Sequence, residues 1–178
     1  MTDAGGREMM GDLRFSWELS GTGWATYRIS DGTSESTDIV SYCTDALSDL
    51  LYAVAGLYEA ADAQRVSFDL EPAETRWRLR RHGADVEITI YRFPDMTTSW
   101  NAPDGEGTRR WNSTQPRAEL GHVVVEAAET VLRLHGEAGY RKKWSEHDFP
   151  SAALDDLRRL HRRDDECRHG NCQVNADS

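Results

Sequence analysis

Alternating apolar and polar side chains over residues 76–81 and 86–91 predict two antiparallel strands joined as a hairpin. Gly83 and Ala84 lie between the two runs, and a two-residue turn there brings the apolar positions of both strands onto one face. A shift of one residue would turn every apolar side chain away from the core, so the pattern admits one register. The expected pairs are Trp77 with Ile90 and Leu79 with Ile88 on the core face, and Arg80 with Glu87 on the other.

Two more strand regions show the same alternation. Apolar residues alternate over 13–19 and over 25–29, and a loop at Gly21–Gly23 predicts a hairpin with Gly23 in the left-handed conformation. Residues 66–70 read as a third region, which a turn over 71–74 joins to the 76–81 strand as a meander. The expected pairs are Phe15 with Ile29, Trp17 with Tyr27, Leu19 with Ala25, Phe68 with Trp77 and Val66 with Leu79.

Helical spacing of apolar residues predicts two long helices and a short one. The first is expected from a cap at Ser36 or Thr37 to about Ala61, with Asp38 near its positive end. The second begins at Pro116 and ends at Gly136, and the third follows Phe149-Pro150. Their apolar stripes are Ile39, Cys43, Ala46, Leu47, Leu50, Val54 and Leu57; Leu120, Val123, Val124, Ala127, Val131 and Leu134; and Leu154, Leu157 and Leu160.

These elements predict an α+β two-layer sandwich. A five-stranded antiparallel sheet in the order 2-1-3-4-5 would carry the two long helices on one face, with the short helix at the C-terminus. The chain of 178 residues fits one domain over 13–161, between a leader at 1–12 and a charged tail at 162–178. No stretch is apolar and long enough for a membrane helix, and no secretory signal is recognisable, so a cytoplasmic protein is expected.

The segment from Pro94 to Pro116 is the main candidate for binding, because loops this long are uncommon in compact domains and are often functional. It holds Trp100 and Trp111, a residue type enriched at interface hot spots, and Arg109 and Arg110 could supply charged contacts beside them. The alternative is that one or both tryptophans fold back over the open end of the core. A second alternative is a pocket between the sheet end and this loop that binds a small ligand or serves a divergent enzyme.

The remaining candidate chemistry is sparse, and no cofactor or metal is expected. His161, Cys167, His169 and Cys172 are zinc-ligand types, but their spacing matches no standard finger and favours a chance cluster in the tail. Cys43 and His122 lie on or beside apolar stripes and read as core residues. Arg76, Arg78 and Arg80 share one strand face and are expected to be solvated, with Glu87 opposite Arg80.

The net charge of −10 disfavours nucleic acid and anionic membranes as partners and permits a basic protein, although solubility alone also accounts for it. The order of elements, with Trp144, Phe149-Pro150 and the leucines of the last helix, resembles small bacterial immunity-type proteins, which accompany secreted toxins of competing strains. The likeness covers the plan of 13–161 and carries over no contact residue; uncharacterised actinobacterial proteins of similar composition look equally similar. It implies a non-catalytic module that sequesters a basic protein by surface complementarity. The oligomeric state is open.

Overall fold

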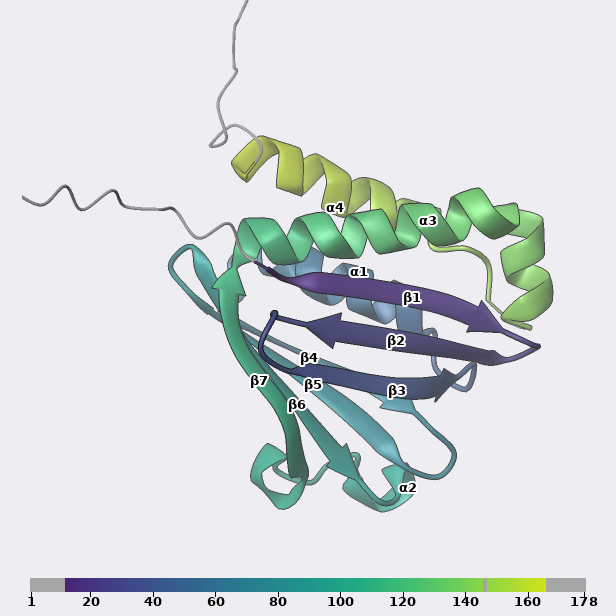
Figure 1. Ribbon diagram of the computed structural model, residues 1–178, viewed down its shortest axis with the longest axis horizontal. Coiled ribbons are helices and arrows are strands. Elements are labelled where there is room, and N and C mark those ends of the chain that lie inside the picture. The colour runs from purple at the N-terminus through teal and green to yellow at the C-terminus, as the bar shows by residue number, and fades with distance from the viewer. Residues whose placement is uncertain (1–11, 146, 166–178) are drawn as a thin grey trace, which may run out of the picture.

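The computed structural model describes residues 12–145 and 147–165, which form strands and helices around one apolar core (Figure 1). In chain order the elements are β1 (Arg14–Ser20), β2 (Trp24–Ser30), β3 (Glu35–Ser41), α1 (Ala46–Gly56), β4 (Ala63–Asp69), β5 (Glu74–His82), β6 (Asp85–Phe93), α2 (Met96–Ser99), the 3-10 helix η1 (Asp104–Glu106), β7 (Thr108–Pro116), α3 (Arg117–Lys143) and α4 (Ser151–Asp164).

The strands form two antiparallel sheets, so the α+β class is confirmed and the single five-stranded sheet is wrong. β1, β2 and β3 make one sheet in that order, and β4, β5, β6 and β7 make the other. Figure 1 shows the strands of the two sheets crossing, with α3 running alongside β1. The error arose because one strand was expected to be part of a helix and another to be part of a loop.

Strand β3 occupies residues where a helix was predicted. Ser36 and Val40 are buried while Ile39 is 55 % exposed, which is the period-two pattern of a strand. Asp38 does not cap a helix; its carboxylate accepts hydrogen bonds from Thr75 and Tyr27 and forms an ion pair with Arg92. The inward face of β3 is thus partly polar, and only partners supplied by other strands make it stable there. Helix α1 accordingly begins only at Ala46, with Asp45 in the cap position in place of Ser36 or Thr37.

The second sheet confirms one predicted register and corrects another. β5 and β6 pair as expected, with Trp77 opposite Ile90 and Leu79 opposite Ile88. β4 is displaced by two residues from the expected register on β5, because Val66 lies opposite Trp77 instead of Leu79. The shift keeps the same face inward, so the alternation could not distinguish the two registers. The first hairpin has its predicted pairs, and Gly23 has a φ of 83°.

The helices complete the core. α3 follows Pro116 as predicted but continues past Gly136, where a φ of 64° breaks the helical geometry and the chain turns into a second helical segment. This turn buries Tyr140 and Trp144 completely, whereas Leu134, which was expected in the apolar stripe, is 68 % exposed. α4 follows Pro150 as predicted and buries its three leucines, and it extends through Asp164 into the segment expected as a tail. None of the helices in the described part of the chain is both long and apolar enough to cross a membrane.

Candidate functional site

The segment expected as a long loop is mostly ordered secondary structure, and it separates the two tryptophans. Trp111 lies on β7 and is 4 % exposed, so it is a core residue. Trp100 follows α2 and is 53 % exposed. Arg109 and Arg110 are exposed on β7, away from the residues that surround Trp100. Of the four predicted contact residues, Trp100 alone lies at the groove described below.

A buried ion pair holds the segment from α2 to η1 against the second sheet. Arg76 was expected to be solvated, but its side chain is fully buried, and its Nε lies 2.8 Å from the Glu74 carboxylate. The guanidinium also donates hydrogen bonds to the backbone oxygens of Ser99 and Ala102 and to the Asp104 carboxylate. Burial alone would raise the pKa of Glu74, but hydrogen bonds from Arg76, Ser99 and Ser67 outweigh it and lower the pKa. The expectation failed because α2 and η1 cover this sheet face.

Trp100 is held by a second arginine. Nη2 of Arg65, on β4, donates a hydrogen bond of 2.6 Å to the backbone oxygen of Trp100. The same guanidinium lies 5.6 Å from the centre of the indole ring and 3.6 Å from the buried Glu74 carboxylate. Arg65 therefore holds Trp100 directly from β4, while Arg76 holds the flanking residues Ser99 and Ala102.

A groove of about 470 Å³ runs between α1, β4 and the residues around Trp100. Its walls consist of Thr44; Asp49, Tyr52 and Ala53 of α1; Gln64, Arg65, Val66 and Ser67 of β4; and Trp100 with Asn101. Four consecutive residues of β4 contribute, and successive side chains of a strand point to opposite faces, so the groove meets this strand at its edge. β4 is an edge strand, and among residues 12–145 and 147–165 it pairs with β5 alone.

The α1 side of the groove carries an acidic and an aromatic residue on one helical face. Tyr52 is 51 % exposed and lies one turn after Asp49. Burial and the neighbouring charge of Asp45 raise the pKa of Asp49 above its ordinary value, against a smaller effect of His147. No ion pair to Asp49 occurs within the described part of the chain, whereas Asp45 lies 3.8 Å from Nδ1 of His147.

The outer edges of β1 and β7 are less available than that of β4. α3 runs alongside β1, leaving a depression of about 560 Å³ that includes the exposed Leu134. β7 carries Arg109 and Arg110, and its pairing with β6 contains a bulge at Ile90/Tyr91. Covering helices, edge charges and bulges are the devices by which proteins protect sheet edges. Helix α1 also packs against β4, but a groove lies between them, and the remaining edge strand, β3, contacts β4 and β7.

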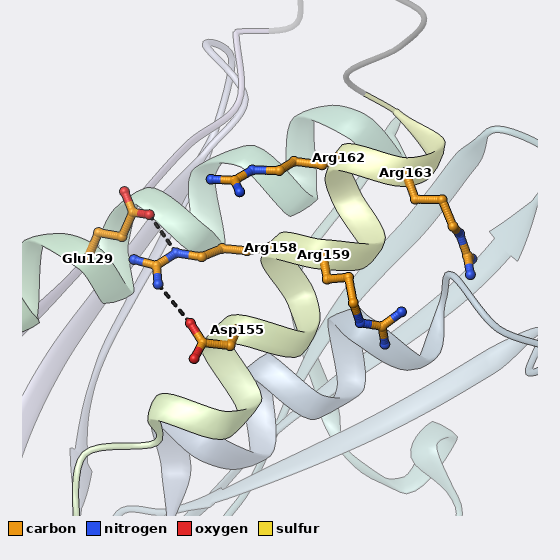
Figure 2. Close-up of a pocket in the computed structure, with 6 residues that line it drawn as sticks. All are labelled: Glu129, Asp155, Arg158, Arg159, Arg162 and Arg163. Atoms are coloured by element: carbon orange, nitrogen blue, oxygen red, sulfur yellow. Dashed lines mark hydrogen bonds and ion pairs between the residues drawn. The ribbon is translucent and has the colours of Figure 1, made fainter.

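A further hollow of about 620 Å³ lies on α4, but its charges are already paired. Figure 2 shows Arg158 between Glu129 of α3 and Asp155 of α4, with hydrogen bonds of 2.8 and 3.0 Å. On the same helix, Arg159 pairs with Asp156 and Arg163 with Asp164. Each of these three arginines already has a carboxylate beside it, which reduces the attraction of the hollow for an anion. We therefore do not assign a site to this helix.

The other candidates for chemistry do not form a site. Cys43 is exposed, where a core position was expected, and a hydrogen bond to the Glu71 carboxylate raises its thiol pKa, which disfavours the reactive thiolate. His122 is also exposed, contrary to expectation. His161 is buried against the Tyr58 hydroxyl, while Cys167, His169 and Cys172 lie outside the described residues. No cluster of three metal-ligating side chains occurs in the part that the structure describes.

Comparison with known proteins adds no identity: no family model, curated protein or solved structure matches this chain. The site therefore depends on its own geometry. Sequence reasoning found Trp100 and predicted a strand at residues 66–70, but it missed Tyr52 and Asp49 and placed that strand inside a five-stranded sheet instead of at an edge. The sequence signal for Tyr52 was weak: it is an aromatic residue that lies outside the apolar stripe of its helix.

Proposed function

We propose that this protein is a non-catalytic binding module that accepts an extended segment of another protein along the outer edge of β4. The observation that carries the proposal is the groove in which an edge strand, Tyr52 and Trp100 meet. An extended chain can add to an exposed strand through backbone hydrogen bonds, while flanking pockets select its side chains. Exposed aromatic residues beside such an edge supply contact area at a small entropic expense.

The fixed position of Trp100 supports binding over a role in folding. An exposed indole contributes little to the core, yet Arg65 binds the Trp100 backbone and Arg76 binds that of the flanking residues Ser99 and Ala102. Preorganisation of this kind reduces the entropy that a partner must offset on binding. The net charge of −10 favours a basic partner. We propose the cytoplasm as the compartment in which the protein acts. Sequestration of a basic toxin is the setting that the resemblance to immunity-type proteins implies.

The test is selection of binding peptides from a random library of decapeptides displayed on phage. Recovered peptides should bind the wild type and lose about tenfold or more in affinity for Trp100→Ala and Tyr52→Ala, as interface hot spots do. Trp24→Ala is the matched control, because Trp24 is 37 % exposed and does not line the groove. Equal binding to all three variants, or failure to recover any peptide, would overturn the proposal.

Strand addition itself is tested on the peptide backbone. N-methylation removes amide donors, and in an added strand alternate amides point toward β4. Methylating one alternate set should abolish binding while methylating the other set should preserve it. Hydrogen exchange of residues 63–69 should slow on binding. Equal sensitivity to both methylation patterns, with no protection in β4, would contradict strand addition.

A further inference from the structure

We infer that the segment bound along β4 carries a lysine or arginine whose cationic group is recognised by Asp49 together with the exposed rings of Tyr52 and Trp100. This inference rests on the proposed function and names the chemistry that the same groove selects. Three observations on the groove walls carry it: an acid without a counter-charge, a basic residue that is already occupied, and two exposed rings.

The first observation is that Asp49 has no ion-pair partner within the described part of the chain, where His147 acts on it only at longer range. Its carboxylate lies on the groove wall, close enough to Asp45 for that charge to raise the pKa of Asp49. Across residues 12–145 and 147–165, no Lys, Arg or His lies within ion-pair distance of it. Asp49 is exposed at the groove, where the charge of Asp45 acts on it more strongly than that of His147, so a cation brought by a ligand would relieve the repulsion between the two acids.

The second observation concerns Arg65, which is the one basic residue among those that line the groove. Its guanidinium contacts the Glu74 carboxylate, the Ser67 hydroxyl and the Trp100 backbone oxygen. These contacts fix its direction and compensate its charge, so Arg65 does not neutralise Asp49. An acidic side chain of a partner would be repelled by Asp49, and Arg65, whose contacts are already made, would not offset that repulsion.

The third observation is the exposure of the two rings. Tyr52 and Trp100 are each about half exposed, at 51 % and 53 %, and both line the groove with Asp49. The face of an aromatic ring attracts a cation, and the attraction is largest when water is excluded from the site. Arg65 already lies 5.6 Å from the indole centre, which shows that this ring accepts a guanidinium at its surface. An acid next to such rings favours a basic side chain over a neutral apolar one.

The experiment compares two decapeptide libraries, one containing lysine and arginine and one lacking both. The first should yield the tighter binders. For a recovered peptide, replacing its key basic residue by glutamine and substituting Asp49→Asn should each weaken binding about tenfold, in the range of close charge pairs at interfaces. The two losses should not add, because both remove the same interaction. Asp49→Glu keeps the charge and should keep the preference.

Asp155→Asn serves as the control, because Asp155 is an exposed acid on α4 outside the groove. Additive losses in the double-mutant cycle, or equally tight binders from the library without basic residues, would overturn the inference. Those results would leave the proposed function standing whenever the peptides still protect β4 and still depend on Trp100. Peptides that fail to depend on Trp100 and Tyr52 refute the proposed function instead. A thermal melt of each variant separates lost binding from lost folding.

Discussion

Arg76 and Glu74 form an ion pair on β5 in which neither side chain is exposed to solvent. Phe93 covers the guanidinium, whose carbon lies 4.2 Å from the ring centre, and the hydroxyl of Ser99 donates a hydrogen bond to the carboxylate. A pair buried this deeply contributes to stability only while both members are present. Its position also links the sheet to the segment that presents Trp100.

Replacing Arg76 by Met should lower the free energy of unfolding by about 3–5 kcal/mol, because Glu74 would remain buried and unpaired. The double replacement of Arg76 and Glu74 by apolar residues should recover most of this loss. Urea denaturation measures both values, and Arg80→Met, at an exposed position of the same strand, should change stability by less than about 0.5 kcal/mol. A similar loss in the single and double variants would show that the ion pair is not the cause.

Trp100 and Trp111 should respond oppositely to truncation, although they lie in the same segment of the sequence. Trp111→Ala removes a core side chain and should destabilise the protein by about 3–5 kcal/mol. Trp100→Ala should change stability by less than about 1 kcal/mol, since the indole is half exposed. Calorimetric melting of the two variants gives the comparison. Collapse of the Trp100 variant would place that residue in the folding core instead of the site.

The sequence predicted those parts of the fold in which apolar alternation is undisturbed. The hairpins around Gly21–Gly23 and Gly83-Ala84 have their expected pairs because the central pairs on one face of each are apolar. β3 was missed because its inward face includes Asp38, which is satisfied by side chains from strands far away in the sequence. β7 was missed because Trp111 and Ser113 are its buried residues, and this short pattern is indistinguishable from a loop.

Among the exposed side chains of the candidate site, the sequence predicted Trp100 alone. The physical reason is that the site is assembled from separate segments of the chain. Trp100, Tyr52 and β4 come from separate parts of the chain, and a groove between them exists only once α1 and the segment after α2 pack beside β4. Arg76 lies on the same strand face as Arg78 and Arg80, and nothing local indicates that η1 will bury it. Periodicity reports the burial of a face by the main core, not by a later segment folding over the opposite side.

The C-terminal boundary of the domain can be tested at a second buried ion pair. Arg117, at the start of α3, donates hydrogen bonds of 3.3 and 3.0 Å to Asp165, and its guanidinium lies 4.2 Å from the Tyr58 ring centre. A chain shortened after residue 165 should retain this pair, whereas one shortened after 161 should lose about 3–5 kcal/mol. Chemical denaturation of the two chains measures the difference. Equal stability would mean that Arg117 finds another partner when Asp165 is removed.

Asp49 should make the ligand-free protein less stable as the pH rises. Its folded pKa is raised by burial and by Asp45, so the native state binds its proton more tightly than the unfolded state does. The stability that this carboxyl contributes is therefore present below its raised pKa. It is lost as the pH rises from the ordinary carboxyl range through the raised value. An asparagine side chain cannot titrate, so Asp49→Asn should gain thermal stability relative to the wild type between about pH 4 and pH 7.

Melting temperatures of the two proteins across that pH range, at constant ionic strength, provide the measurement. The difference should be most favourable to the variant near neutral pH and should diminish on acidification. If the difference in melting temperature between the two proteins is the same at every pH, the charge of Asp49 is already compensated in the folded protein. A gain in stability of Asp49→Asn that grows toward neutral pH would show that the isolated protein leaves the Asp49 charge uncompensated, as the proposed recognition of a cation requires.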